Sequence, residues 1–183
     1  MNKCMKMITS AYMRESRYKT INIKEKIIKK NRIVLVIVIS IVLIVVDQIV
    51  KFIISNELYN STIAVVNGVL NFTYVENTGG AFGIGSDSTI IFVIVNIIII
   101  CIIAKFILSK KNNLSYSILV SLSLILAGGV GNLIDRVFRG FVIDYIDINP
   151  MVKYPIFNIA DICVVMGCIG IAIYTIVTTI KER

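Results

Sequence analysis

The sequence contains no histidine and has few charged residues for its length. The chain has 183 residues, of which 16% are charged and 57% are hydrophobic. Without histidine, the Ser–His and Cys–His arrangements for nucleophilic catalysis and the common zinc motifs are excluded. No G-x-S-x-G motif is present either. Any catalysis by this chain must therefore use other side chains.

Cysteine is also scarce. The four cysteines are Cys4, Cys101, Cys163 and Cys168, and no C-x-x-C spacing occurs among them. Three lie in apolar runs and one lies in the basic N-terminal segment, so we interpret them as small apolar residues of helices. We expect no disulfide framework, no metal site and no cofactor.

The small charged fraction reflects apolar blocks, since soluble domains carry about 25% charged residues. Each block has 19 to 23 residues, and about 20 apolar residues suffice to cross a bilayer as a helix. The blocks are Ile33–Ile54, Ile90–Leu108, Tyr116–Ile134 and Asn158–Ile180. The first block is longer than a signal-peptide core and no A-x-A site follows it, so we interpret it as a retained helix. The sequence therefore predicts a membrane all-α protein with four transmembrane helices.

The basic residues predict how these helices are oriented. Four spans place both termini on one side, and this side, with the connection at 105–115, carries 15 of the 19 Lys and Arg residues. The positive-inside rule then makes both termini cytoplasmic. Residues 1–32 form a basic cytoplasmic extension, in which we expect 1–20 to be disordered and 21–32 to lie on anionic lipid. The net charge of +8 is explained by this orientation and requires no nucleic-acid partner.

The outer segment 55–88, between the first and second spans, has a strand pattern. In "VLNFTYVEN", Leu70, Phe72 and Tyr74 alternate with Asn71, Thr73 and Val75. "NTGGAFGIG" follows and is rich in turn residues. We expect a small extracellular β-rich subdomain between helices 1 and 2, with a glycine-bearing loop.

Polar residues gather at the outer ends of three predicted helices, where charged groups are costly and usually functional. They are Asp47 and Lys51 on the first, Asn132, Asp135 and Arg136 on the third, and Asn158 and Asp161 on the fourth, with Asp144 and Asp147 in the segment before the fourth. Considered alone, the i,i+4 pair of Asp47 and Lys51 is interpreted as a structural ion pair. Asp147 is interpreted as a solvated residue.

Asp161 differs from the other acids because no basic residue lies within four positions of it. Its carboxylate should be partly desolvated and should need a neighbouring group. Asp144 is the best candidate, since the connection to it contains Pro150 and Pro155 and is long enough to turn back. Two carboxylates in one small pocket share a proton, which places a general acid beside a general base. Such a pair can activate water against an amide carbonyl.

Five motifs then appear in one order along the four spans: "DQIVK" (47–51), "NTGGAF" (77–82), "GGVGNLIDR" (128–136), "FVIDY" (141–145) and "FNIAD" (157–161). Together they resemble lipoprotein signal peptidase, or signal peptidase II, over about residues 33–180. The resemblance implies an intramembrane aspartic endopeptidase domain over 33–183. It would remove signal peptides from prolipoproteins by cutting before the diacylglyceryl cysteine. It also implies a multi-pass protein of the bacterial inner membrane, with its active site facing outward.

The resemblance also implies roles for individual residues. Asp144 and Asp161 would be the catalytic pair. A second group would support the substrate backbone and the pair: Asn77, Asn132, Arg136 and Asn158. A third group would be structural, with Asp47 and Lys51 fixing the first span and Asp135 pairing with Arg136 or holding the helix ends together. The implied partners are prolipoprotein substrates and membrane lipids, and we expect a monomer.

Three alternatives remain open from the sequence. A small proton-coupled transporter or channel subunit also uses intramembrane acids, although it should carry them at mid-bilayer. A catalytically silent tethering protein fits the composition but does not explain Asp144 and Asp161. Another kind of aspartic membrane protease is possible, although the chain lacks a G-x-G-D signature.

Overall fold

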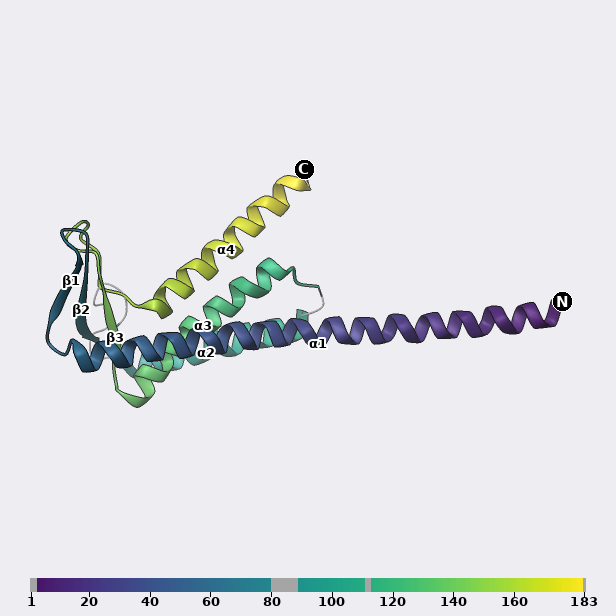
Figure 1. Ribbon diagram of the computed structural model, residues 1–183, viewed down its shortest axis with the longest axis horizontal. Coiled ribbons are helices and arrows are strands. Elements are labelled where there is room, and N and C mark those ends of the chain that lie inside the picture. Colours follow the sequence, from purple (N-terminus) through teal and green to yellow (C-terminus); the bar gives the residue numbers. More distant parts are fainter. Residues whose placement is uncertain (1–2, 80–88, 111–112, 183) are drawn as a thin grey trace.

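A computed structural model describes residues 3–79, 89–110 and 113–182 of the chain. Four helices and three strands follow one another along it, and Figure 1 shows their arrangement. Their bounds are α1 (Lys3–Glu57), β1 (Thr62–Val66), β2 (Leu70–Asn77), α2 (Thr89–Lys110), α3 (Tyr116–Phe138), β3 (Val142–Asp147) and α4 (Ile159–Lys181).

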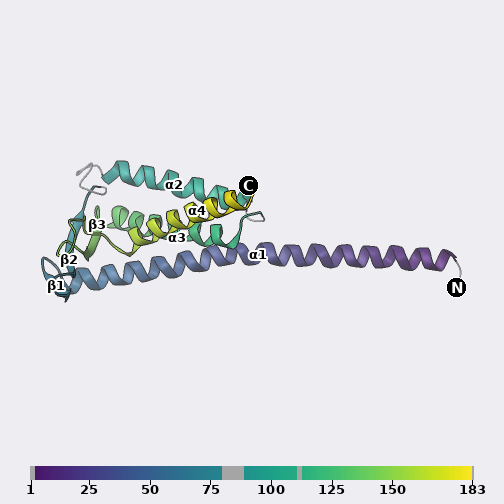
Figure 2. The ribbon, with the colours of Figure 1, turned by 90° about the horizontal axis from the view of Figure 1, so that it is seen from above.

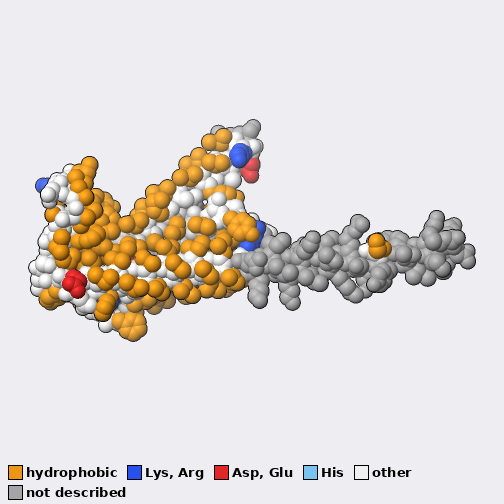
Figure 3. Space-filling view, viewed as in Figure 1, with side chains coloured by type: hydrophobic (Ala, Val, Ile, Leu, Met, Phe, Trp, Pro, Cys, Tyr) orange, Lys and Arg blue, Asp and Glu red, His pale blue; other side chains and the backbone are white. Residues whose placement is uncertain are grey.

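Four helical segments are long and apolar enough to cross a membrane. They are Arg32–Glu57 within α1 and the whole of α2, α3 and α4. Each agrees with a predicted span to within four residues at either end. Figure 3 shows an apolar surface over the helices on the visible face, with charged side chains mainly near its two ends. The prediction of four membrane helices is confirmed.

The N-terminal extension differs from the prediction. Helix α1 begins at Lys3, so residues 3–20, which were expected to be disordered, are helical. Residues 1–32 contain no glycine and no proline, so nothing in this segment interrupts a helix that continues into the first span. The extension projects well beyond the other helices (Figures 1 and 2).

Helix α3 is the centre of the bundle and packs against α1, α2 and α4. Small residues permit these close approaches. A Cβ atom added at Gly128 would lie 2.8 Å from Cγ2 of Val164 on α4. One added at Gly131 would lie 2.8 Å from Oδ2 of Asp47 on α1. The "GGVG" stretch thus brings two neighbouring helices within contact of the outer half of α3.

Helix α2 lies on the other side of α3 from α1 (Figure 2). Within the bundle, Nδ2 of Asn96 donates a hydrogen bond of 2.8 Å to the Gly129 carbonyl oxygen. At the outer end, the Thr89 hydroxyl donates to the Gly140 carbonyl oxygen at 3.1 Å. These polar contacts fix α2 along α3 without involving the polar residues that the sequence singled out.

The three strands form one antiparallel sheet in the order β1-β2-β3, at the end of the helix bundle that lies away from both chain termini (Figure 1). The strand expected at "VLNFTYVEN" is β2. Strand β3 was not expected, and the sheet is not confined to the segment between helices 1 and 2, because β3 joins α3 to α4. In the register of β2 and β3, Val75 lies opposite Asp144. The expected glycine-bearing loop falls mainly on residues 80–88, outside the described residues.

The sheet rests on an apolar core that fixes its position over the bundle. Ile54, Leu58, Ile143 and Tyr145 are buried together, and Phe72 of β2 packs against them. Phe72 and Tyr145 meet edge to face, with ring centroids 5.9 Å apart. This core fixes the position of β3, and with it Asp144, relative to the end of α1.

Candidate active site

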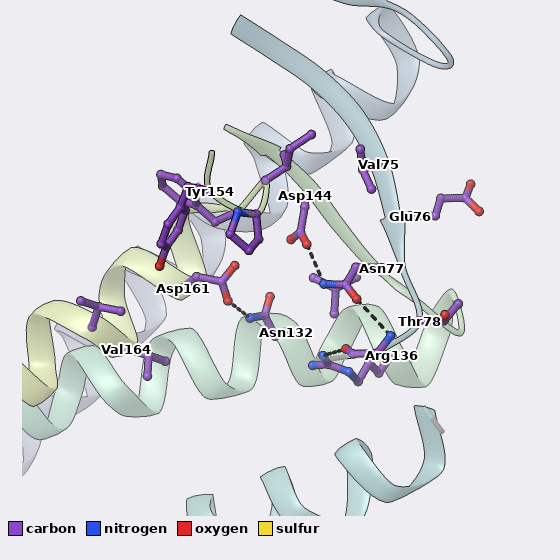
Figure 4. A pocket seen from close by; sticks show the side chains of 16 residues that line it. Val75, Glu76, Asn77, Thr78, Asn132, Arg136, Asp144, Tyr154, Asp161 and Val164 are labelled. Carbon is purple, nitrogen blue, oxygen red and sulfur yellow. Dashed lines mark hydrogen bonds between the residues drawn. The ribbon is translucent and has the colours of Figure 1, made fainter. Parts of the chain in front are cut away.

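A pocket of about 570 Å³ lies between the sheet, the C-terminal half of α3 and the start of α4. This volume is in the range of small-ligand sites. Five of the six residues proposed for catalysis and substrate support line it and are labelled in Figure 4: Asn77, Asn132, Arg136, Asp144 and Asp161. We call it the acid pocket, because Asp144 and Asp161 both line it.

Asp144 reaches the acid pocket from the middle of β3 and is 3% exposed. Both of its carboxylate oxygens accept hydrogen bonds from amides. Nδ2 of Asn77, at the end of β2, donates to Oδ2 at 2.8 Å. Nδ2 of Asn158, just before α4, donates to Oδ1 at 2.7 Å.

Asp161 lies in the first turn of α4, and the local sequence explains its orientation. Asn158 is the N-cap, and its Oδ1 accepts from the Asp161 N–H at 2.9 Å. In return, Asp161 Oδ2 accepts from the Asn158 N–H at 3.1 Å, which completes a capping box. The other oxygen, Oδ1, accepts from Nδ2 of Asn132 on α3 at 2.8 Å.

Asn158 therefore contacts both acids, one through its side-chain amide and the other through its backbone. Among the described residues, no hydrogen bond joins the two carboxylates directly, and neither acid forms an ion pair. Burial, and next the neighbouring Asp161 carboxylate, raise the pKa of Asp144 to about 7. The structure thus brings together the two acids that the sequence paired, in surroundings where Asp144 holds a proton near neutral pH.

A second set of polar residues joins α1 to α3 beside the acid pocket. We call it the ion-pair cluster, and its members are Asp47, Gln48, Lys51, Asp135 and Arg139. The Lys51 ammonium lies 2.9 Å from Asp47 Oδ2 and 2.8 Å from Asp135 Oδ2, and all three side chains are buried. Asp135 Oδ1 pairs in addition with Arg139. Gln48 donates to this same Oδ1 at 3.2 Å and to the Gly131 carbonyl oxygen at 3.1 Å.

The predicted pair of Asp47 and Lys51 is present. Of the two roles predicted for Asp135, pairing with Arg136 is wrong, whereas holding helix ends together agrees with its contact with Lys51 on α1. Neighbouring residues on a helix point in different directions, whereas residues four apart share a face, so Asp135 pairs with Arg139. Arg136 instead turns toward the acid pocket, where its NH2 group donates to the Gly79 carbonyl oxygen at 3.0 Å. Its guanidinium carbon lies 5.4 Å from the centre of the Phe92 ring on α2.

Sequence reasoning missed Gln48 and Arg139. Both could have been found, since Gln48 lies within the "DQIVK" motif and Arg139 is four residues from Asp135. It also treated Asp147 as solvated. Asp147 is buried instead, and its carboxylate accepts from the Asn149 N–H at 2.9 Å and from the Thr73 hydroxyl at 3.3 Å.

The part of the chain that the structure describes contains no candidate metal site. No group of three or more cysteine, aspartate or glutamate side chains there could hold an ion. The carboxylates of Asp47 and Asp135, in the ion-pair cluster, form ion pairs with Lys51 and Arg139.

Comparison with known proteins decides between the alternatives. A family model described as "Signal peptidase (SPase) II" matches residues 39–177. This chain belongs to the signal peptidase II family. It is 39% identical to the lipoprotein signal peptidase of Clostridioides difficile strain 630, over 81% of this chain and 99% of that protein. With the lipoprotein signal peptidase of Lactobacillus gasseri it shares 33% identity, over 84% of this chain and 99% of that one.

A solved structure shows the same fold. It is described as a bacterial membrane enzyme determined by the in meso method at 2.3 Å resolution, and it superposes with a TM-score of 0.75. The two chains are 35% identical, and the match covers 81% of this chain and 91% of that one. Membership of the signal peptidase II family makes this protein a membrane protease of the aspartic type. The transporter alternative is not supported.

Proposed function

We propose that this signal peptidase II cuts diacylglyceryl-modified prolipoproteins immediately before the lipidated cysteine, with Asp144 and Asp161 as its catalytic pair. The observation that carries the proposal is the acid pocket itself. Two carboxylates from different elements line it, and their hydrogen bonds come from amides. No cation pairs with either acid in the described part of the chain, so one of the two acids can keep a proton.

The two acids have different surroundings, which assigns their roles. Asp161 lies in the first turn of α4, where the helix dipole favours a negative charge. Asp144 is almost fully buried and holds the proton, since its pKa is raised to about 7. Asp161 therefore takes a proton from a water molecule, whose oxygen attacks the scissile carbonyl. Asp144 gives its proton to the carbonyl oxygen, which forms a tetrahedral diol. As the C–N bond breaks, Asp161 gives the proton that it took from water to the leaving nitrogen, and Asp144 takes a proton back from a diol hydroxyl.

The remaining pocket residues orient the reactants. Asn132 and Asn158 hold the two carboxylates through their amides. Asn77, which also donates to Asp144, and Arg136, which donates to the Gly79 carbonyl oxygen, lie across the pocket from Asp161 (Figure 4). There they can bind the extended backbone of a substrate. An extended peptide has unpaired N–H and C=O groups that such side chains satisfy.

The position of the pocket suits a substrate that cannot leave the bilayer. The acid pocket lies at the sheet end of the bundle, away from both chain termini (Figures 1 and 4). With both termini in the cytoplasm, as the distribution of basic residues favours, this end faces the outside of the cytoplasmic membrane. The acyl chains of the lipidated cysteine would then contact the apolar helix surface, while water enters the pocket from outside. A monomer contains every residue that this mechanism uses.

The test is cleavage of a diacylglyceryl prolipoprotein by the purified enzyme in lipid vesicles. Asp144→Asn and Asp161→Asn should each reduce the cleavage rate by about 1,000-fold or more while the melting temperature shows a folded protein. Asp147→Asn is the matched control, since Asp147 lies on the same strand as Asp144 but does not line the pocket, and its rate should stay within about threefold of the wild-type rate. Cleavage that survives in either dyad variant would refute the catalytic pair.

A further inference from the structure

Lys51 makes one contact that its place in the ion-pair cluster does not explain. The side chain is fully buried at the outer end of α1. Its ammonium group has three N–H donors and three acceptors at short distance. Two are Asp47 Oδ2 at 2.9 Å and Asp135 Oδ2 at 2.8 Å, and the third is Oδ1 of Asn132 at 2.9 Å. The third donor thus leaves the charged groups and reaches a residue of the acid pocket.

The amide of Asn132 has only one orientation that satisfies its neighbours. Its Oδ1 accepts from Lys51 and, at 3.1 Å, from Nδ2 of Asn158, which uses both lone pairs. Its Nδ2 donates to Asp161 Oδ1 at 2.8 Å. If the amide were rotated by half a turn, its NH2 group would face an ammonium, which accepts no hydrogen bond, and its oxygen would face a carboxylate. Both new contacts would be repulsive.

Asn158 is oriented by a different device, the N-cap of α4, in which its Oδ1 accepts the Asp161 N–H. Its Nδ2 is thereby directed at Asp144. Asn132 lies in the middle of α3 and has no such cap. Of its three hydrogen-bonding neighbours, only Lys51 is a cation that cannot accept a hydrogen bond. Asp161 and Asn158 favour the same orientation of the Asn132 amide, and the charge-assisted hydrogen bond from Lys51 strengthens it.

We propose that Lys51 is a positioning residue for catalysis, which fixes the Asn132 amide so that its NH2 group holds the carboxylate of Asp161. The proposal rests on the proposed function, in which Asp161 activates water. Of the three residues that Lys51 contacts, Asn132 is the one that lines the acid pocket, so Lys51 acts one residue away from the reacting atoms. Lys51 is thus the member of the ion-pair cluster that also contacts a residue of the acid pocket.

Removing Lys51 alone would leave the buried carboxylates of Asp47 and Asp135 with Arg139 as their one cation. The test therefore uses a variant in which Asp47 is already neutral. Asp47→Asn is the parent variant, in which an amide oxygen can still accept the Ala160 N–H that Asp47 Oδ1 binds. In Asp47→Asn/Lys51→Met, the apolar side chain has a similar length but no donor. Asp135 and Arg139 remain as a neutral pair. Both variants are assayed for cleavage in vesicles and for their melting temperature.

We expect the methionine variant to have a kcat at least tenfold below that of the Asp47→Asn parent, with KM changed less than threefold. Adding Asn132→Ala to the parent should cause a similar loss, and adding it to the methionine variant should cause no further loss. Arg139→Gln is the control for damage to the ion-pair cluster, because Arg139 does not touch Asn132. It should lower the melting temperature with kcat within about threefold of wild type.

An unchanged kcat in the methionine variant, or losses that multiply when Asn132→Ala is added, would overturn the proposal. If the methionine variant does not fold, Asp47→Asn/Lys51→Gln, which retains an N–H donor, is compared with Asp47→Asn/Asn132→Ala. A higher kcat in the glutamine variant supports the positioning role, and an equal or lower one overturns it. Since every rate is taken relative to an active parent, these outcomes are separate from the dyad test, whose failure would appear as activity in Asp144→Asn or Asp161→Asn.

Discussion

The ion-pair cluster and the acid pocket are two carboxylate pairs that lie side by side and share Asn132 as a neighbour. Burial does not separate them, since Asp135 is fully buried and Asp144 is 3% exposed. Their partners do. Asp135 meets the cations of Lys51 and Arg139, whereas Asp144 meets the neutral amides of Asn77 and Asn158. A buried carboxylate that pairs with cations joins helices, whereas one that accepts hydrogen bonds from neutral amides can hold a proton for chemistry.

The largest loss of stability is predicted for Asp135→Asn, in the ion-pair cluster. The change leaves Lys51 and Arg139 buried or half-buried without their shared carboxylate, and removing one partner of a buried ion pair costs about 3–5 kcal/mol. The free energy of unfolding in detergent micelles should fall by this amount. Asp161→Asn is the matched substitution in the acid pocket, where no ion pair is lost, and it should lower stability by less than half as much. Equal losses of unfolding free energy in the two variants would contradict the distinction between an ion-paired acid and an acid held by amides.

A smaller effect is predicted for the pH dependence of stability. The ordinary pKa of Asp144 is 3.8, and in the folded protein it is raised to about 7, so between these values the folded state binds more protons than the unfolded state. The stabilising protonated form is complete below the unfolded value and is lost as pH rises toward 7. The free energy of unfolding of the wild-type protein should therefore fall over this window, by about 1–3 kcal/mol. The fall should be absent in Asp144→Asn.

The control for the pH experiment is Asp147→Asn. Backbone and side-chain hydrogen bonds from Asn149 and Thr73 lower the pKa of Asp147, so it is charged throughout the window. This variant should keep the wild-type slope. Parallel curves for the wild-type protein and Asp144→Asn would contradict the assignment of the proton to Asp144.

The sequence predicted the features that local patterns reveal, namely the apolar spans and an acidic residue with no basic residue nearby. Twenty apolar residues in a row have one common solution in a bilayer, so the four spans were evident. The pairing of Asp144 with Asp161 could be inferred because Asp161 had no local cation. Strand β2 was visible from its alternation, but β3 has six residues with two acids, and its pairing partner comes from a distant segment.

The partner of Asp135 shows a second limit. Its local partner, Arg139, follows from helix geometry and could have been found. Its other partner, Lys51, lies on another helix, and only the close approach permitted by Gly131 brings α1 near enough for the contact. Such contacts depend on helix packing, which a single sequence does not reveal. The helical state of residues 3–20 was missed because a basic, polar composition was interpreted as disorder, although the segment contains no glycine or proline.

The central claim is that Asp144, in the acid pocket, holds a proton near neutral pH. Infrared spectroscopy measures this directly, since a protonated carboxyl has a C=O stretch distinct from that of a carboxylate. In the substrate-free enzyme we predict a protonated carboxyl that loses its proton with a midpoint near pH 7. This signal should be absent in Asp144→Asn and unchanged in Asp147→Asn. A spectrum with no protonated carboxyl at pH 6, or one whose signal persists in Asp144→Asn, would contradict the account.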